Sequence, residues 1–399
     1  MHILLVHQNF PGQFRELAPA WLARGHRVSA VGTTPAKQFW DSRWQGLTYL
    51  PYSCPQDQLR AKVLADHLRQ LRHDHQLEPQ LVIAHSGWGE AAPVKEIWPD
   101  RPLVVYPELW GSEHALGVNF DPQQQPIAQA EKQAIRRHNQ RTLRALHLAD
   151  AIVAPTAFQR DSFPFPWRER FTLIHEGVNC KRLQPNPRAS HLLPNGQLLD
   201  RSNSVITYVS RHFEPLRGLH TFLAALPPLL TAHPALQVVM VGGAGTSYGQ
   251  EASHPQGHLA EQLEKLPASF DHSRLHCVGP LPYEKLCALL QLSSAHVYLT
   301  YPYTLSWSLM EAMACGAAVV GNHGGPLDEV IEPGSNGLLV DFNSPAQLTA
   351  GLQELLSHPD RRQQLAQAAR RTVEQHYSLE LALARYERLF GQLLSHTSR

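Results

Sequence analysis

Short apolar stretches alternate with amphipathic ones along most of the chain, which is the pattern of parallel strands connected by helices. In the first half, the apolar stretches predict strands at residues 2–7, 27–32, 81–84, 103–106, 151–154 and 172–175. Between them, residues 58–75 and 128–148 have the spacing of amphipathic helices. This alternation predicts an α/β domain with a mostly parallel sheet and helices on both faces.

Residues 177–204 interrupt the pattern, because they are rich in Pro, Asn and Ser and show no periodicity. Beyond them the alternation resumes, with strands expected at 205–210, 237–241, 275–278 and 295–299. A chain of 399 residues also exceeds one ordinary core. We therefore expect two doubly wound, Rossmann-like domains facing a central cleft. Their predicted bounds are 1–185 and 205–376, with a linker at 186–204 and a C-terminal helix, 377–399, that crosses back to the first domain.

The composition mainly argues against certain classes of protein. The chain has 35 Lys and Arg against 34 Asp and Glu. This near-zero net charge disfavours binding of nucleic acid by bulk electrostatic attraction. The five cysteines are far apart and form no C-x-x-C pair, as in a reduced cytosolic protein. No basic leader and no run of membrane-spanning length stands out. We expect a cytoplasmic protein, with contact at the inner face of a membrane through the arginines of 128–148 as an alternative to a solvated helix face.

Residues 300–325 hold the first candidate for chemistry, Glu311. The sequence predicts a strand end, a polar aromatic loop and a helix that begins near 306–308, so that Glu311 lies in the first turn at the carboxyl edge of a sheet. Two interpretations are open. Ser308 and Glu311 have the spacing of a capping box, in which the carboxylate binds a free backbone N–H. Alternatively, the carboxylate binds a nucleotide.

Two arginines, Arg211 and Arg217, flank the start of a predicted helix at the end of the strand 205–210. A helix N-terminus attracts anions through its free N–H groups and its dipole, and guanidinium groups match phosphate oxygens. A diphosphate is the ligand that this combination favours. The alternative is a pair of surface arginines, with Arg211 bonded to Glu214.

At this point the sequence resembles the retaining glycosyltransferases of family four, the glycosyl transferases group 1, in a bacterial subgroup. In the second half, the segments that carry the resemblance are 211–218, 241–243, 278–279, 311–316, 324–325 and 336–340. In the first half they are 7–14, 85–90 and 117–122. The resemblance implies the GT-B fold and transfer of a sugar from a nucleoside diphosphate sugar to a glycan, a lipid-linked saccharide or another hydroxyl acceptor.

The resemblance also implies roles for residues in loops at the ends of predicted strands. Arg211 and Arg217 would clamp the diphosphate, and Glu311 would accept hydrogen bonds from the ribose hydroxyls. No metal ion or other cofactor is expected, because the arginines and a helix dipole would stabilise the leaving group in a same-face substitution. The donor-binding residues that the resemblance assigns are Gly12, Gly243, Val278, Pro280, Leu281, Tyr303, Leu305, Ser306, Trp307 and Glu311.

The chain departs from the family pattern at two places. Tyr303 stands where the E-x7-E motif has its first glutamate, which ordinarily helps to hold the transferred sugar. Glu108 follows a strand end where many relatives carry a histidine, so we assign it a catalytic or an acceptor role, with a capping or ion-paired glutamate as the alternative. His85 and Glu90 complete the predicted acceptor side, and the loops 9–13 and 108–122 are expected to recognise the acceptor.

Two other functions compete with glycosyl transfer. A non-hydrolysing nucleotide-sugar epimerase would need an acid and base pair facing the sugar, which the sequence does not offer. A non-catalytic scaffold that binds sugar nucleotides is suggested by Tyr303, but Arg211, Arg217 and Glu311 favour an enzyme. The sequence leaves the sugar, the base, the acceptor and the oligomeric state undefined.

Overall fold

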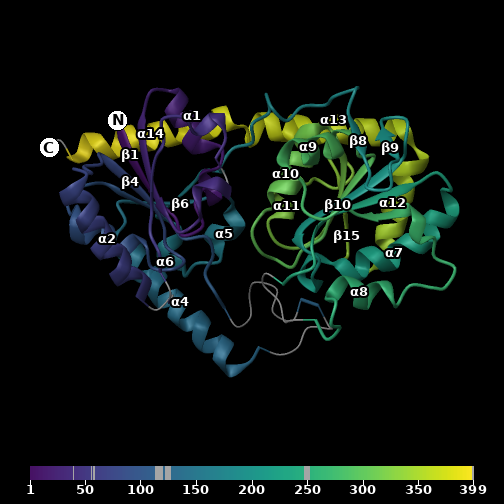
Figure 1. Cartoon of the computed structure of the whole chain (residues 1–399), viewed down its shortest axis with the longest axis horizontal. Helices are drawn as coiled ribbons and strands as arrows, with labels where there is room; N and C mark the ends of the chain where they lie inside the picture. The colour runs from purple at the N-terminus through teal and green to yellow at the C-terminus, as the bar shows by residue number, and fades with distance from the viewer. Residues whose placement is uncertain are drawn as a thin grey trace. The chain divides into compact units, whose positions relative to one another are not determined.

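The computed structural model describes residues 1–397 apart from 39, 55, 57–58, 113–119, 122–126 and 247–251. The chain forms two compact units, which are labelled in Figure 1 by their elements. The first unit consists of Met1–Val118, Gln125–Asn179 and Tyr377–Arg399, and the second of Asn119–Gln124 and Cys180–His376. The chain therefore leaves the first unit after residue 179 and returns to it at residue 377.

The first unit is built on a parallel sheet of seven strands in the order β3-β2-β1-β4-β5-β6-β7. In that order the strands are Thr48–Pro51, Arg27–Gly32, His2–Val6, Leu81–His85, Leu103–Tyr106, Ala151–Ala154 and Phe171–Leu173. The register places Ile3 of β1 opposite Val28 of β2 and Leu81 of β4. Strand β3 was not among the strands that we expected, because its sequence, TYLP, is short and half-exposed.

Alternate residues of each strand face opposite cores, as the two-residue period of a strand requires. On one face Ile3 and Leu5 pack with α1 and α14, and on the other Leu4 and Val6 pack with α2, α3 and α4. The helices of this unit are α1 (Leu17–Ala23), α2 (Arg60–Asp74), α3 (Ala91–Ile97), α4 (Gln129–Leu148), α5 (Ala157–Asp161), α6 (Phe165–Arg168) and α14 (Leu379–Thr397).

The second unit is built on a parallel sheet of six strands in the order β12-β11-β10-β13-β14-β15. In that order they are Leu275–Cys277, Gln237–Gly243, Val205–His212, Ala295–Tyr298, Ala318–Asn322 and Leu338–Val340. The helices are α7 (Leu219–Ala232), α8 (His258–Leu263), α9 (Tyr283–Leu292), α10 (Trp307–Cys315), α11 (Leu327–Val330), α12 (Pro345–Ser357) and α13 (Pro359–His376). No helix in the described part of the chain is long and apolar enough to span a membrane.

The residues expected as a linker, 186–204, form a β-hairpin in the structure. Strands β8 (Ser190–Leu192) and β9 (Leu198–Asp200) pair in antiparallel fashion. Leu199 is buried in one core with Val239 and Leu289 of the second unit. The turn between the strands contains Asn195-Gly196, with Gly196 at a φ of 87°, which is the strongest short-range signal for a hairpin. The hairpin was not predicted, because strands of three residues are too short to show a period.

Both parallel sheets reverse their strand order once. The first sheet does so between β1 and β4, and the second between β10 and β13. In doubly wound sheets, ligands bind at such a switch point, outside the carboxyl ends of the strands, because the connecting helices leave on opposite faces there. The fold thus marks one position in each unit where a site is expected.

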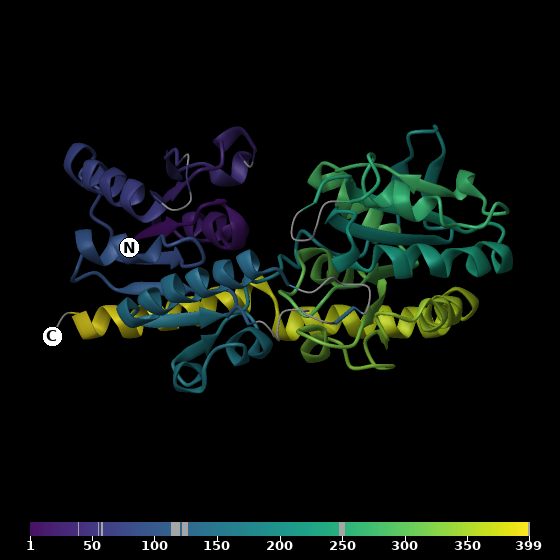
Figure 2. The same ribbon diagram turned by 90° about the horizontal axis from the view of Figure 1, so that it is seen from below.

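The C-terminal helix α14 is part of the core of the first unit (Figures 1 and 2, yellow). The ring of the buried Phe390 lies 5.6 Å from that of Trp21 and 5.8 Å from that of Tyr386. We predict that Phe390→Ala lowers the free energy of unfolding of this unit by about 3–5 kcal/mol, because it leaves a cavity between α1 and α14. Denaturant unfolding followed by tryptophan fluorescence measures the loss. The exposed Arg388 supplies the control, Arg388→Ala, and an equal loss in both variants would contradict the packing role of α14.

Candidate active site

In the second unit, Arg217 lies at the switch point between β10 and β13. Its Nη1 donates hydrogen bonds to the hydroxyl of Tyr298, at 3.1 Å, and to Oγ1 of Thr300, at 2.9 Å. Tyr298 is the last residue of β13 and Thr300 follows it closely. The guanidinium of Arg217, which follows β10, is thus fixed to the end of the neighbouring strand β13.

The surroundings of Arg217 are themselves held in place. The buried Thr300 donates its backbone N–H to Oδ1 of Asn322, at the end of β14, and Nδ2 of Asn322 donates back to the Thr300 carbonyl. The hydroxyl of Tyr208 donates to the carbonyl of Arg217 at 2.7 Å. Three neighbouring strands therefore determine where this guanidinium points, so that little order is lost when it binds an anion.

Arg211 differs from Arg217 in its surroundings. It is exposed at the end of β10, and its side chain forms no hydrogen bond or ion pair with any part of the chain that the structure describes. The alternative contact with Glu214 is therefore absent from the described residues, and Glu214 itself is buried. Helix α7 begins after Gly218, whose φ of 65° lies in the left-handed region, and its first N–H groups lie just beyond Arg217. Two guanidinium groups and a helix N-terminus thus occur within eight residues, 211–218.

We expected Glu311 in the first turn of α10, but it lies one turn further into the helix. The N-cap is Ser306, whose Oγ accepts the backbone N–H of Ser308 at 3.2 Å. Ser308 is therefore helical, and the capping box that it would form with Glu311 is absent. Glu311 is 2% exposed, and its Oε1 accepts the hydroxyl of Tyr283, the first residue of α9, at 2.9 Å. The Glu311 carboxylate therefore does not belong to the cap of α10.

The remaining residues of the predicted donor set follow the carboxyl ends of β11, β12 and β13. Gly243 ends β11, and Val278 follows β12 and donates its N–H to the carbonyl of Met240 at 3.0 Å. Leu281 is half-buried and Pro280 is exposed in the loop that leads to α9. Because the strands are parallel, these ends share one edge of the sheet with Arg217. In the loop before α10, Tyr303, Leu305 and Ser306 are half-buried, as is Trp307, the first residue of α10.

In the first unit, two histidines meet at the switch point between β1 and β4. The ring of His7, directly after β1, lies 4.8 Å from that of His85, the last residue of β4. The ring of Trp88 stacks on His85 at 4.7 Å. Burial lowers the pKa of His7 well below its ordinary value, and the nearby His85 lowers it further. His7 is therefore neutral at neutral pH.

Glu108 joins this group in a strained conformation. Its Oε2 lies 3.4 Å from Nε2 of His85, and its φ of 62° is in the left-handed region, which a glutamate rarely adopts. The side chain of Gln159 holds the strained peptide by donating to the Glu108 carbonyl at 3.0 Å. Such strain persists where the fold holds a residue for a specific contact, and it is common at binding sites.

Glu90 is fully buried beside this group. The backbone N–H of Trp88 donates to its Oε2 at 3.2 Å, whereas its Oε1 has no hydrogen-bond partner among the described residues. Burial raises the pKa of Glu90 from about 4.5 to about 7, against the opposing effects of His85 and Arg60. The structure thus brings His85, Glu90 and Glu108 together around a histidine pair at one switch point.

Gly12 lies at the same edge of the first unit. Its φ is 43°, and a Cβ atom there would come within 2.5 Å of Nε2 of His7. Oε1 of Gln13 accepts a hydrogen bond of 2.6 Å from the same nitrogen. The glycine is required because the loop passes directly over the His7 ring. Of the loop 108–122 on the expected acceptor side, residues 113–119 and 122 lie outside the described residues.

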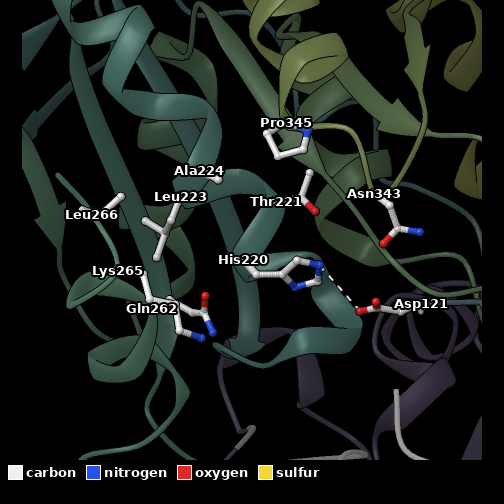
Figure 3. Close-up of a pocket in the computed structure, with 10 residues that line it drawn as sticks. All are labelled: Asp121, His220, Thr221, Leu223, Ala224, Gln262, Lys265, Leu266, Asn343 and Pro345. Atoms are coloured by element: carbon white, nitrogen blue, oxygen red, sulfur yellow. Dashed lines mark ion pairs between the residues drawn. The ribbon is translucent and has the colours of Figure 1, made fainter. Parts of the chain in front are cut away.

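A cavity of about 470 Å³ lies elsewhere in the second unit, at the start of α7 (Figure 3). In Figure 3 the ring of His220 points toward Asp121, with Nε2 and Oδ2 3.6 Å apart, and Lys265 and Gln262 lie on the opposite wall. Burial lowers the pKa of His220, and Asp121 opposes that shift. None of the predicted donor residues lines this cavity. It is therefore separate from the group at the switch point.

Comparison with known protein families assigns both halves of the chain. Residues 25–183 match the model of the glycosyl transferase family 4 group, and residues 194–372 match that of the glycosyl transferases group 1. This chain belongs to glycosyltransferase family 4. The family resemblance inferred from the motifs is thereby confirmed.

Curated relatives of this family 4 chain are distant. An uncharacterized glycosyltransferase of Methanocaldococcus jannaschii is 27% identical over 35% of the chain and 36% of its own length. A D-inositol 3-phosphate glycosyltransferase of Thermobispora bispora is 27% identical over 58% of the chain and 52% of its own length. The chain thus spans about half the length, or less, of these relatives.

Solved structures match the whole family 4 chain. Sucrose-phosphate synthase from Thermosynechococcus elongatus has a TM-score of 0.73 at 19% identity, covering 99% of this chain and 100% of that one. HepE of Anabaena, solved with UDP-glucose, has a TM-score of 0.70 at 18% identity, covering 98% and 100%. The fold is GT-B, as the sequence predicted.

Sequence reasoning missed the residues that position Arg217 and Glu311 in this family 4 chain. Arg217 binds Tyr298 and Thr300, and Thr300 in turn binds Asn322. Glu311 binds Tyr283. A signal existed, since polar residues directly after apolar strands at a switch point are candidates for a site. In the other unit, His7 has the same position after β1.

Glu90 gives the family 4 chain a pH-dependent stability. A carboxyl whose pKa is higher in the folded state favours folding at low pH, and ionisation above the unfolded pKa removes that contribution. We predict that the free energy of unfolding falls by about 3 kcal/mol between about pH 4.5 and about pH 8 relative to Glu90→Gln, which cannot ionise. Denaturant unfolding of both proteins across this range measures the difference. Parallel profiles would contradict the raised pKa.

Proposed function

We propose that this chain is a retaining glycosyltransferase that moves a sugar from a nucleoside diphosphate sugar to a hydroxyl acceptor. Membership of family 4 supports this class of reaction. The observation that carries the proposal is Arg217, fixed by Tyr298 and Thr300 at the switch point of the second unit. A positioned guanidinium at this edge is suited to the phosphates of a nucleotide donor.

Arg217 and Arg211 would bind the diphosphate from different starting states. Arg217 is pre-positioned, whereas the exposed Arg211 would become ordered when the donor arrives. The N-terminus of α7 adds N–H groups and the positive end of a helix dipole. Together they would stabilise the charge that develops on the leaving diphosphate, without a metal ion.

Glu311 would bind the ribose of the donor. Its burial and its hydrogen bond with Tyr283 fix the carboxylate, and a carboxylate can accept both ribose hydroxyls. Gly243 and the loop of Val278, Pro280 and Leu281, which leads directly to Tyr283, would contact the base. Backbone N–H groups at Leu305, Ser306 and Trp307 would meet the sugar or the phosphates.

UDP-glucose is the first donor to test, because a GT-B structure at 98% coverage, HepE, was solved with it. The sugar contact is where this chain departs from its family. Tyr303 supplies a phenol where relatives have a carboxylate, so its hydroxyl would donate to a sugar oxygen as well as accept. This exchange would alter which sugar hydroxyl is recognised.

In the first unit, His85, Glu90 and Glu108 would bind the acceptor, with the Gly12 loop adding backbone N–H groups to the donor phosphate. The acceptor oxygen would attack the anomeric carbon from the face that the diphosphate leaves. Its proton would pass to the leaving phosphate oxygen as the sugar–phosphate bond breaks, and Glu108 would position the attacking hydroxyl. We place the reaction in the cytoplasm, with the exposed Arg136 and Arg137 of α4 as the surface that an anionic membrane would meet.

A panel of nucleoside diphosphate sugars, scored by thermal shift and by release of the nucleoside diphosphate, tests the function. We expect one donor to stabilise the protein and to be slowly hydrolysed. Arg217→Ala should lower kcat/KM for that donor by about 10²–10³-fold, because it removes charge stabilisation from the leaving group.

The exposed Arg371 on α13 supplies the matched control, Arg371→Ala, which should retain full turnover. Near-normal turnover of Arg217→Ala would remove it from the clamp. If no donor produces a shift or hydrolysis, the scaffold suggested by Tyr303 becomes the better account.

The ribose contact has its own test. The nucleoside diphosphate selected by the panel should bind at least about tenfold more tightly than its 2′-deoxy form, because the deoxy form leaves a buried acceptor unpaired. In Glu311→Gln this preference should shrink, whereas Tyr283→Phe should retain it. Calorimetric titration measures both ligands on the three proteins. An undiminished preference in Glu311→Gln would assign the ribose to another residue.

A further inference from the structure

A cavity of about 460 Å³ opens at the amino edge of the sheet in the second unit. Its wall includes Ser294, directly before β13, and Ala318, the first residue of β14. Arg201, four residues before β10, lies on the same wall. Arg217 and Thr300 lie at the opposite, carboxyl edge of these strands. The cavity is therefore distinct from the proposed donor site.

One face of helix α13 forms the other wall. Arg362, Gln363, Gln367 and Arg370 recur at the spacing of a single helix face and all line the cavity. Each carries side-chain N–H groups. None of the described residues that line this cavity is an aspartate or a glutamate. The wall is thus rich in donors and carries net positive charge.

The positive charge of Arg370 is already paired within the protein. Its Nη2 lies 2.7 Å from a carboxylate oxygen of Glu374, and its guanidinium also donates to the carbonyls of Leu183, Ala314 and Cys180. This arginine joins α10 and α13 to the start of the second unit. It is a structural residue and leaves little capacity for a ligand.

Arg201 and Arg362 are in a different state. In the part of the chain that the structure describes, each donates to a single carbonyl, Arg201 to that of Gln291 at 2.6 Å and Arg362 to that of Leu355 at 3.2 Å. A guanidinium has five N–H groups, so most of their donor capacity remains. Burial lowers the pKa of Arg362, and the positive charge of Arg201 lowers it further. Two like charges thus face one cavity without a carboxylate between them.

The neighbouring amides extend this donor surface. Gln363 and Gln367 are exposed, and their side chains form no hydrogen bonds with the part of the chain that the structure describes. A phosphate group carries up to two charges and three acceptor oxygens, which two guanidinium forks and amide N–H groups match. A volume of about 460 Å³ also accommodates more than the phosphate itself.

We propose that this cavity binds the phosphate group of a small phosphorylated metabolite through Arg201 and Arg362. The site is separate from the nucleotide donor site and does not depend on the proposed transfer reaction. Helix α10 connects the two places, since it begins at Trp307 beside the proposed donor loop and ends before Gly316, which lines the cavity.

Calorimetric titration of the whole chain with glycerol 3-phosphate at constant ionic strength tests the site, with glycerol as the neutral probe. We expect saturable binding of glycerol 3-phosphate and none of glycerol. Arg201→Ala and Arg362→Ala should each weaken binding by about tenfold, because each removes charged hydrogen bonds. Arg201 is exposed, so its variant should fold normally even if Arg362→Ala does not.

Two variants serve as controls. Arg371→Ala removes the same charge from an exposed position of the same helix and should bind the probe as the unaltered chain does. Arg217→Ala should also bind it normally while losing affinity for nucleoside diphosphates.

Unchanged affinity in both Arg201→Ala and Arg362→Ala would overturn the site, as would failure of the unaltered chain to bind the probe. Loss of probe binding in Arg217→Ala would show instead that the phosphate enters the donor site.

Discussion

The parallel pairing of β10 with β13 is the constraint on which the proposed chemistry of the second unit depends. Ile206 lies opposite Ala295 and Tyr208 opposite Val297, so the two strands end side by side although nearly ninety residues separate them in the chain. Their helices then leave on opposite faces of the sheet, which opens a space at the carboxyl edge. Arg217 and Thr300 meet across this space. A change in register would separate them.

The first unit uses the same constraint with different side chains. The pairing of β1 with β4 brings His7 and His85 into contact, and the apolar surroundings keep these rings and Glu90 out of water. Burial disfavours charge, which is why the pKa of His7 is lowered and that of Glu90 is raised. Glu108 reaches the same group only through a strained backbone. One topology thus places arginines at this edge in one unit, and histidines with glutamates in the other.

The opposite edge of the second sheet shows how arginines can be divided between structure and binding. Arg370 is saturated by three carbonyls and a carboxylate, whereas Arg201 and Arg362 each bind one carbonyl. The hydrogen-bond partners of each arginine, and not the number of arginines at this edge, distinguish a structural arginine from one that is available to an anion. The same criterion separates Arg217, which is held in place, from the exposed Arg211.

The sequence by itself determined the two α/β units, because strands buried on both faces are continuous apolar runs and the helices between them are amphipathic. It also singled out Arg217 and Glu108, which follow strands within a few residues, His85 at the end of a strand, and Glu311 in the helix after one. Only the tertiary structure placed Tyr298 and Asn322 around Arg217, paired Tyr283 with Glu311, and moved the cap from Ser308 to Ser306. Periodicity reports which residues are buried along one element. It contains no information about which ends of distant strands become neighbours, because that depends on sheet order and register.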